Sequence, residues 1–372
     1  MKNYFFTLLL LIVICSCTSK NVDNRTIDVA RAINNPISLG INKYVSKIKY
    51  VPLETKSECM IGDVKKILKS KEFIFVADFS DNLFVFDLNG KFVKKVGNKG
   101  KGPNEYNTIT DFAINNVKNE IIIASLNEFL VFKFNGDFIR KSRLNDSSLQ
   151  VVSVDDSDRL YYIKPIGRPS KDLEDLICIY NIKGELLKTI KASIIRQKGD
   201  IPFFNSIYTK NNNTYYKEEF SNKLYKLNSK FERKVFLDLK FGRYAFDQVD
   251  FSFARVKYWG SKYRLKQFMD FENIDLIIVQ KGLVGNNILT LILDKETGKL
   301  INPNNLSDRK FEGIIIKGIS HKPLSDYNNE LLTLIDPEEI VEHRSEISNE
   351  LAKASSVLKI DSNPVIGIMY TK

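Results

Sequence analysis

The sequence is poor in the residues that metal centres and acid–base catalysis use most. Only 2 of its 372 residues are histidine and 4 are cysteine, and their spacing matches no zinc or redox motif. His-Glu-x-x-His and Gly-x-Ser-x-Gly motifs are also missing. His321 stands in a predicted turn and His343 in a predicted helix, where structural or solvent-facing roles are expected. The sequence therefore predicts no metal, no cofactor and no catalytic residues of these classes.

Basic residues are in excess, but they form no concentrated run. The formal net charge is +11, yet the sequence has no run of five or more Lys or Arg of the kind found in nucleic-acid-binding tails. A lysine-rich, solvated surface is the simplest interpretation, and an acidic glycan or a lipid headgroup is the alternative partner. No nucleic-acid partner is expected.

No apolar run is long enough to span a bilayer. Residues 4–14 are apolar and follow Lys2, which is typical of a signal peptide over residues 1–16. The run ends in Ile14-Cys15-Ser16-Cys17, which resembles a bacterial lipobox. This resemblance implies cleavage before Cys17 and acylation of that residue. Several acyl chains, at about 0.8 kcal/mol per buried CH₂, would hold a soluble domain on a membrane. The alternative is an ordinary secretory signal with a stray cysteine.

The remaining two cysteines and the segment after the signal leave open questions. Cys59 and Cys178 would form a disulfide in an oxidising compartment or stay as separate buried thiols. Residues 17–42 are polar and are interpreted as a lipidated N-terminus and tether. Residues 27–33 within them are compatible with a short strand or turn. Residues 43–372 form the predicted folded domain.

Short strand-like runs separated by turn residues recur along this domain. Asn89-Gly90 joins two such runs, and Asn-Gly is a strong hairpin signal because both turn residues need a positive φ. Equivalent turn positions are spaced 46, 48, 46 and 68 residues apart. They are Gly90, Gly136, Gly184, Lys230 and Gly298. A period in the forties with about four strands per unit is typical of a β-propeller. A two-sheet sandwich does not explain a fixed period.

Both ends of the domain contain strand-like sequence, which indicates how the ring closes. A sixth, shorter unit includes residues 311–317 and 331–335, and residues 46–53 and 364–370 are predicted to complete the last blade. Asp336-Pro337 begins a predicted helix that runs to about Ala354. The predicted fold is all-β: a six-bladed propeller of four-stranded antiparallel blades, closed by N- and C-terminal strands, with one short C-terminal helix.

Four segments carry a resemblance to a known family. They are Tyr50–Glu54, Asp87–Phe92, Gly97–Tyr106 and Asn363–Ile366. They resemble the six-bladed β-propeller lipoproteins of Gram-negative bacteria, relatives of the NHL-repeat propellers. The resemblance extends from Val45 to the C-terminus and implies an outer-membrane lipoprotein of the bacterial cell envelope. Because most members of that family have no assigned activity, it implies fold and location more than mechanism.

The glycine-rich stretch Gly97–Tyr106 is the first candidate site. It differs from a phosphate-binding loop because Pro103 follows Gly102 and a strand, not a helix, comes next. It is interpreted either as a tight crossing between blades or as a ligand-binding rim beside the central channel. The second interpretation makes candidates of four residues: Lys99, Lys101, Glu105 and Tyr106.

An aromatic and basic insertion, Gly242–Phe268, is the second candidate. It accounts for the longest spacing between repeats and contains the single tryptophan. Its aromatic residues are interpreted as packing residues or as platforms that stack on sugar rings, with arginines donating to hydroxyl or carboxylate groups. The candidates are Arg255, Tyr258, Trp259, Tyr263 and Arg264.

Together these features favour a membrane-anchored, monomeric binding module for a glycan, a peptide or a partner protein. A lyase or hydrolase of polysaccharide or peptidoglycan, with its site at the channel mouth, is the alternative. Such an enzyme needs two carboxylates that converge in space, whereas the pairs Asp155-Asp156 and Asp78/Asp81 fall in turns, which Asp favours for its own geometry. A structural subunit of an outer-membrane uptake complex is a third, weaker possibility.

Overall fold

The computed structural model describes most of the chain after residue 24. The described residues are 25–38, 43–145, 151–164, 173–193, 198–199, 206–210, 212–218, 221–246, 250–251, 258–282, 288–305, 326–327, 329–345 and 347–372. Cys17, Arg255, His321 and residues 311–317 lie outside them.

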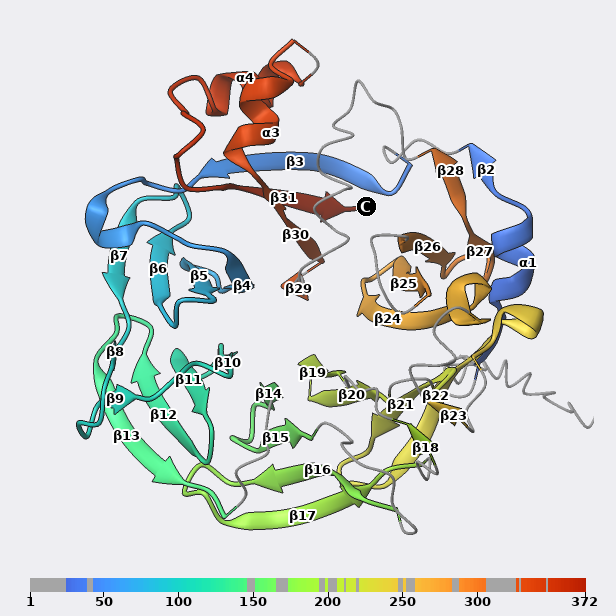
Figure 1. Cartoon of the computed structure of the whole chain (residues 1–372), viewed down its shortest axis with the longest axis horizontal. Coiled ribbons are helices and arrows are strands. Elements are labelled where there is room, and N and C mark those ends of the chain that lie inside the picture. Colours follow the sequence, from blue (N-terminus) through green and yellow to red (C-terminus); the bar gives the residue numbers. More distant parts are fainter. Residues whose placement is uncertain are drawn as a thin grey trace, which may run out of the picture.

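Six four-stranded antiparallel sheets surround a common axis as the blades of a propeller (Figure 1). Blade one is β4 (Val64–Lys69), β5 (Phe73–Asp78), β6 (Leu83–Asp87) and β7 (Phe92–Lys95). Blade two is β10 (Asp111–Asn115), β11 (Glu120–Ser125), β12 (Glu128–Lys133) and β13 (Phe138–Arg143). Blade three is β14 (Val151–Val154), β15 (Leu160–Ile163), β16 (Asp175–Tyr180) and β17 (Leu186–Lys191).

The second half of the ring follows the same plan. Blade four is β19 (Ser206–Lys210), β20 (Asn213–Lys217), β21 (Lys223–Leu227) and β22 (Arg233–Lys240). Blade five is β24 (Tyr263–Asp270), β25 (Ile274–Lys281), β26 (Ile288–Asp294) and β27 (Leu300–Ile301). Blade six is β29 (Asp326–Tyr327), β30 (Glu330–Ile335), β31 (Val365–Thr371) and β3 (Val45–Pro52). The predicted fold class and blade number are confirmed.

The two ends of the domain meet in blade six, as the sequence predicts. β3 is the outer strand of this blade and pairs antiparallel with the C-terminal β31, from Val45 opposite Thr371 to Pro52 opposite Val365. β31 is in turn hydrogen-bonded to β30. The last blade therefore needs strands from both termini, and the ring closes without an open sheet edge between its first and last blades.

Alternating side chains of each strand explain why the blades stack. In β5, Ile74 and Val76 pack into the cluster shared with blade six, whereas Phe75 and Ala77 pack into the cluster shared with blade two. Successive side chains of a strand point to opposite faces of its sheet. The described residues form six such clusters, one at each interface between neighbouring blades. Neither face of a blade is left without a partner.

Part of the segment expected to be a tether packs on the propeller. We call residues 25–38 the N-terminal strap. It contains β1 (Arg25–Asp28), α1 (Val29–Asn34) and β2 (Ile37–Ser38). β1 adds a fifth, parallel strand to blade four beside β22, and β2 pairs with β28 (Pro303–Asn305) next to blade five. Asp28 caps α1 by accepting from Arg31 N at 2.9 Å.

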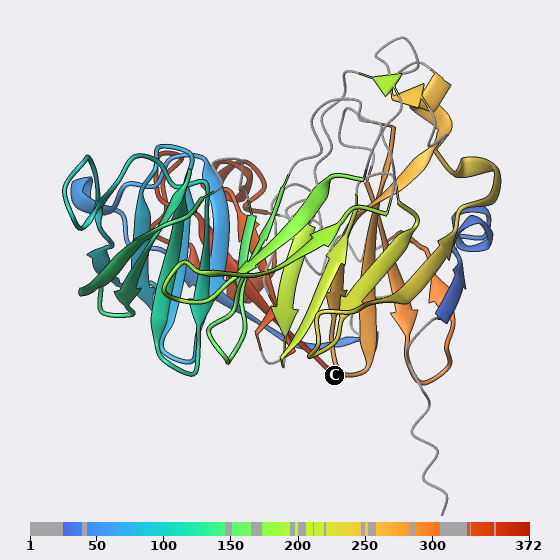
Figure 2. The same cartoon turned by 90° about the horizontal axis from the view of Figure 1, so that it is seen from below.

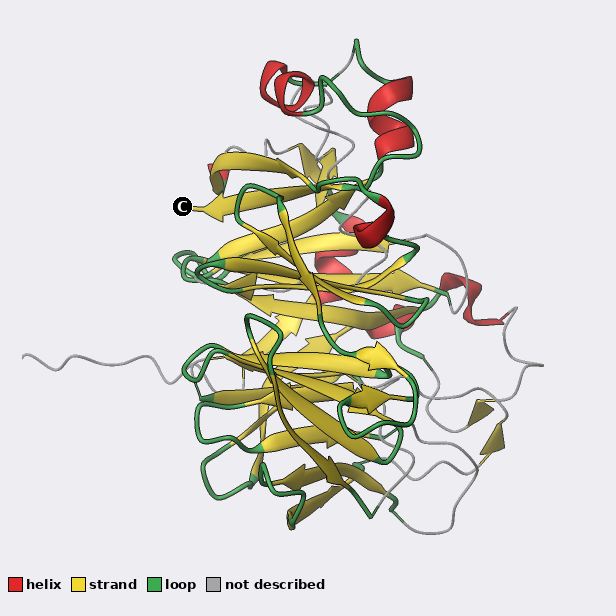
Figure 3. Cartoon of the chain, turned by 90° about the vertical axis from the view of Figure 1, so that its left-hand side faces the viewer, coloured by secondary structure: helices red, strands yellow, loops and turns green. Residues whose placement is uncertain are grey.

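The helices are few, short and peripheral (Figure 3). The single C-terminal helix expected from Pro337 to about Ala354 is instead two, α3 (Pro337–Glu342) and α4 (Asn349–Ala354). Ser348 provides the physical reason, because its hydroxyl caps α4 by accepting from Leu351 N at 3.1 Å and so begins a new helix. Among the described residues, no helix is long and apolar enough to cross a membrane.

Candidate functional site

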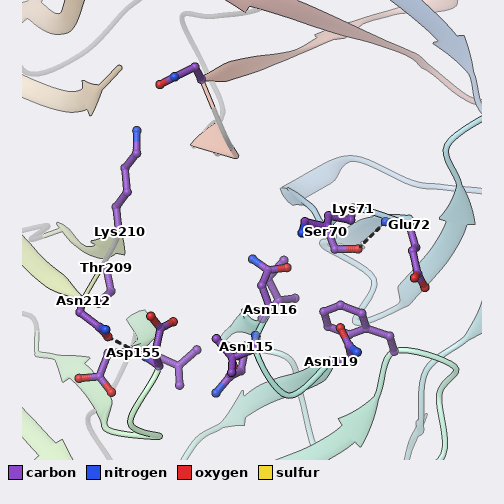
Figure 4. Close-up of a pocket in the computed structure, with 16 residues that line it drawn as sticks. Ser70, Lys71, Glu72, Asn115, Asn116, Asn119, Asp155, Thr209, Lys210 and Asn212 are labelled. Atoms are coloured by element: carbon purple, nitrogen blue, oxygen red, sulfur yellow. Dashed lines mark hydrogen bonds between the residues drawn. The ribbon is translucent and has the colours of Figure 1, made fainter. Parts of the chain in front are cut away.

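A polar cavity of about 780 Å³ lies at the centre of the ring on one face. Apart from Phe134, its lining comes from the turns between the first and second strands of five blades and the strand ends beside them, so we call this side of the ring the turn face (Figure 4). We call the opposite side the loop face and this space the central cavity. Most of its lining residues are polar: Ser70, Lys71, Glu72, Asn115, Asn116, Asn119, Asp155, Asp156, Thr209, Lys210, Asn212 and Asn329.

Several of these polar residues maintain the turns themselves. Asp155 accepts from the backbone N of Ser157 and Arg159, from Arg159 Nε at 2.6 Å and from the Tyr161 hydroxyl at 2.9 Å. Asn115 accepts from the backbone N of Val117. These groups are already satisfied, so their first role is to fix the positions of the turns around the cavity.

Other lining side chains are available to a ligand. Lys71, Asn116, Asn119 and Asp156 make no side-chain hydrogen bond or ion pair within the described part of the chain. Lys71 and Asn116 come from different blades and point toward the middle of the cavity (Figure 4). An amide both donates and accepts, and an ammonium group donates. The cavity thus offers hydrogen-bonding groups suited to a hydroxyl-rich or otherwise polar molecule.

A series of polar contacts near the axis holds the cavity walls in place. Each pair of neighbouring blades is joined by at least one. They are Lys66 Nζ to Asp111 Oδ1 (2.9 Å), Val152 N to Asp111 Oδ2 (2.9 Å), Ser153 Oγ to Thr209 Oγ1 (2.9 Å), Lys210 Nζ to Asp270 O, Asn329 Nδ2 to Glu272 Oε2 (2.9 Å) and Lys69 Nζ to Glu330 Oε2 (2.6 Å). Neighbouring blades are therefore fixed to one another by polar contacts around the axis.

The glycine-rich stretch lies elsewhere. Its strands β8 (Asn98–Lys99) and β9 (Glu105–Tyr106) are at the outer edge of the ring, near β13 (Figure 1). The expected position beside the central channel is therefore wrong. The reason is that the connection from β7 to β10 first forms a parallel β8–β9 pair outside the blades before it turns inward.

Contacts within this stretch favour its interpretation as a crossing between blades. Tyr106 is fully buried, and its hydroxyl donates to Asp81 O at 3.1 Å. Burial raises the pKa of Tyr106 well above its usual value. Glu105 accepts from Gly102 N at 2.8 Å, and Lys99 pairs with Asp81 at 2.9 Å. Lys101 is exposed. A ligand role for these four residues stays a prediction.

The aromatic insertion divides between the core and a blade strand. Trp259 is fully buried and packs on Phe246, with ring centroids 5.4 Å apart, in the interface between blades three and four. That environment matches the packing alternative and makes the indole inaccessible as a sugar platform. Tyr263 and Arg264 belong to β24 of blade five. Tyr263 is also buried, and Arg264 donates to Gln280 at 2.7 Å.

The candidates of this insertion are not brought together into one site by the described contacts. Tyr258 begins the 3₁₀ turn Tyr258–Ser261, and Arg255 lies outside the described residues. Cys59 and Cys178 do not form a disulfide. They are separate, buried, free thiols. Within the described residues, no group of three or more His, Cys, Asp or Glu could hold a metal ion.

A buried glutamate that the sequence analysis did not find, Glu218, lies between blades three and four. Glu218 accepts from the backbone N and the hydroxyl of Ser193, both at 2.7 Å, and from Arg233 at 3.4 Å. Burial raises the pKa of Glu218, although Ser193 and Arg233 oppose this shift. Ser193 and Glu218 are far apart in sequence and form no motif, so no sequence signal marks them.

The residues that line the central cavity were missed as well, although the sequence carries a signal for them. In the repeats, Ser70-Lys71-Glu72, Asn115-Asn116 and Asn212 all lie at or just after the end of the first strand of a blade. Because first strands all lie next to the axis, the residues after them must converge on one face. Aligning these turns across repeats would have predicted a polar central site.

Comparisons with known proteins agree with this architecture. A protein of Bacteroides fragilis described as exported has a similar structure, with a TM-score of 0.69 at 14% identity over 94% of this chain and 99% of that one. A member of the DUF4221 family from Bacteroides vulgatus has a TM-score of 0.56 at 12% identity over 88% and 97%. These likenesses support the fold alone. No curated protein sequence matches the chain. The family model "Domain of unknown function (DUF4934)" matches residues 24–370, and the chain therefore belongs to the DUF4934 family.

Proposed function

We propose that this protein is a lipid-anchored interaction module of the bacterial cell envelope, which binds a glycan in its central cavity. The observation that carries the proposal is the convergence of amide, hydroxyl, ammonium and carboxylate groups from five blades on one cavity of about 780 Å³. Ligand sites of this size are normally concave and contain a few convergent polar groups. The fold is also similar to that of a protein described as exported.

The binding proposal predicts a loss of affinity when two cavity side chains are removed together. Each of Lys71 and Asn116 is expected to contribute about 1 kcal/mol through hydrogen bonds, so the double variant Lys71→Ala/Asn116→Ala should bind about 30-fold more weakly. A panel of neutral and acidic oligosaccharides would identify a binder, and isothermal titration calorimetry would measure both proteins. Lys188→Ala, at an exposed position of the outer strand β17, is the matched control. Unchanged affinity in the double variant would exclude the cavity as the site.

The anchor proposal predicts that one of two neighbouring cysteines decides where the protein is found. Cys17→Ser removes the thiol that would carry lipid, so the protein is expected to move from the membrane pellet to the soluble fraction. Cys15→Ser preserves Ile14 and Ser16, the lipobox-like residues, and should leave the protein in the membrane. Fractionation of cells followed by immunoblotting distinguishes the two. Retention of Cys17→Ser in the membrane would contradict the proposal.

The lyase or hydrolase alternative is not favoured by a specific observation. Glu72 and Asp156 are acidic side chains of the central cavity, but they come from different blades and no contact joins them within the described residues. The alternative therefore stays a prediction.

A further inference from the structure

We propose that the N-terminal strap orients the propeller so that its turn face, with the central cavity, lies toward the bilayer that holds Cys17. The interaction surface is the turn face and its partner is the polar headgroup layer of that bilayer. The inference rests on the lipid anchor proposed above and concerns what the anchor does to the propeller.

The strap shortens the distance between anchor and domain. Arg25 is already paired with β22 of blade four, so only eight residue steps separate it from Cys17. A fully extended chain spans at most about 3.6 Å per residue, so the Cα atom of Cys17 lies within about 29 Å of that of Arg25. Had the tether continued to residue 42, it would have left the propeller free to turn in any direction.

The strap is also attached firmly. The Arg25 side chain pairs with the fully buried Asp275 of blade five at 3.3 Å. Val29 is fully buried among residues of blades four and five. The Tyr244 hydroxyl donates to Asn34 Oδ1 at 2.6 Å. These contacts hold the strap on blades four and five. The lipid anchor is therefore connected to the ring at a fixed position.

The direction of β1 determines that the chain from Cys17 reaches the propeller at its turn face. β22 begins at Arg233, after the turn between the third and fourth strands, and such turns lie on the same side as the turns that line the cavity. β1 is parallel to β22, with Arg25 opposite Leu237, so the chain enters from the turn face. Leu237 is four residue steps from Arg233 along β22, about 13 Å at 3.3 Å per residue. Cys17 can then extend only about 16 Å beyond this end of β22.

The loop face is the less suitable side for a bilayer. The paired strands β18 (Lys198–Gly199) and β23 (Asp250–Phe251) stand above the ring on that side (Figure 2). They rise beside the part of the ring that carries the strap, drawn in blue at the right of Figure 2. A bilayer approaching the loop face would meet this projection first, whereas the turn face has short turns only among its described residues.

The test compares energy transfer from four single-cysteine sites to a headgroup-labelled lipid. The full lipidated protein is reconstituted in vesicles of phosphatidylethanolamine and phosphatidylglycerol. Lys230→Cys and Lys240→Cys label the turn-face and loop-face ends of blade four, and Lys71→Cys and Phe79→Cys label the same two faces of blade one. The native Cys59 and Cys178 are buried and should not react with the dye.

Higher transfer from Lys230→Cys and Lys71→Cys than from their loop-face partners is the expected result. Equal transfer from both sites of blade four, with less from both sites of blade one, would mean that the ring stands on its edge and would overturn the inference. Higher transfer from the loop-face sites would overturn it too. A flexible Gly/Ser insert of about 30 residues after Lys20, which adds about 30 Å of r.m.s. length, should abolish the difference between faces.

Failure of the anchor is recognised separately. A protein that does not float with the vesicles lacks the anchor, and both proposals then fall. A protein that floats but shows the wrong pattern of transfer overturns the orientation alone.

Discussion

Replacing Gly90 with alanine is expected to destabilise the propeller by about 3 kcal/mol or more. Gly90 lies in the turn between β6 and β7 with φ +85°, and a Cβ atom there would stand 2.0 Å from the carbonyl oxygen of Pro52. The Gly90 oxygen also accepts from Glu54 N at 2.8 Å. An added methyl group must therefore push apart the junction between blades six and one, which closes the ring.

Gly298→Ala is the matched control for this effect. Gly298 occupies the equivalent turn of blade five with φ +68°, but no atom lies within 4 Å of the point where an added Cβ atom would stand. Its substitution costs only the left-handed backbone conformation, about 1 kcal/mol. Urea denaturation of both variants measures the difference in the free energy of unfolding. Equal losses of unfolding free energy in the two variants would show that the close approach to Pro52 does not contribute. The backbone conformation of glycine would then explain both results.

The repeat could be predicted from sequence because each blade encodes its own turn. Gly90, Gly136, Gly184 and Gly298 all have a positive φ, whereas Asn89 and Asn135 do not, so the glycine of each turn was predicted correctly and the expectation of two positive-φ residues was wrong. The same alternation of side chains that forms one strand also supplies both of its inter-blade contacts. Fold class, blade number and closure by the terminal strands therefore followed from local pattern and a count of repeats.

The strap could not be predicted in the same way. β1 is only four residues long, and its partner β22 lies more than two hundred residues later in the chain. Apart from residues 27–33, which are compatible with a short strand or turn, the composition of this segment suggested a tether. Its order comes from contacts such as Arg25 with Asp275, which only the closed ring brings together.

Chemical type alone also did not show which candidate residues are accessible. Trp259 was selected because aromatic residues stack on sugars, yet the same large apolar surface also favours burial between blades. Conversely, Lys71 and Asn116 lie in turns and belong to no motif, and only the closed ring brings them to one cavity. The lipobox and the likeness to NHL-type propellers stay predictions, because the family match itself concerns residues 24–370.

Asp275→Asn is expected to change how stability depends on pH. The Asp275 side chain is fully buried, lies 3.3 Å from Arg25 and 3.0 Å from Lys295, and is paired across the strands with Asp270. Burial raises the pKa of Asp275 to about 7, with Lys295 opposing the shift and the charge of Asp270 adding to it. Between about pH 4 and pH 7 the Asp275 carboxyl group is therefore protonated in the folded protein and ionised in the unfolded chain.

The sign of the effect follows from that difference. A carboxyl group with a folded-state pKa above its unfolded value stabilises the fold most at low pH and loses this contribution as pH rises toward 7. The wild-type free energy of unfolding should thus fall relative to that of Asp275→Asn between pH 4 and pH 7, by up to about 4 kcal/mol. Both proteins would be unfolded with urea at intervals across this range, so that the change in slope is independent of any constant effect of the substitution.

Asp294→Asn in the same blade provides the opposite case. Although burial opposes it, hydrogen bonds from Thr297 and Tyr44 lower the pKa of Asp294. Its contribution is present above the unfolded value and is lost only as pH falls further, so this variant should match the wild-type slope between pH 5 and pH 8. If Asp275→Asn also kept the wild-type slope, its carboxylate would have to remain ionised in the folded protein. The two cations beside it would then outweigh the cost of burial, and Arg25 would hold the strap through an ion pair across the whole pH range measured.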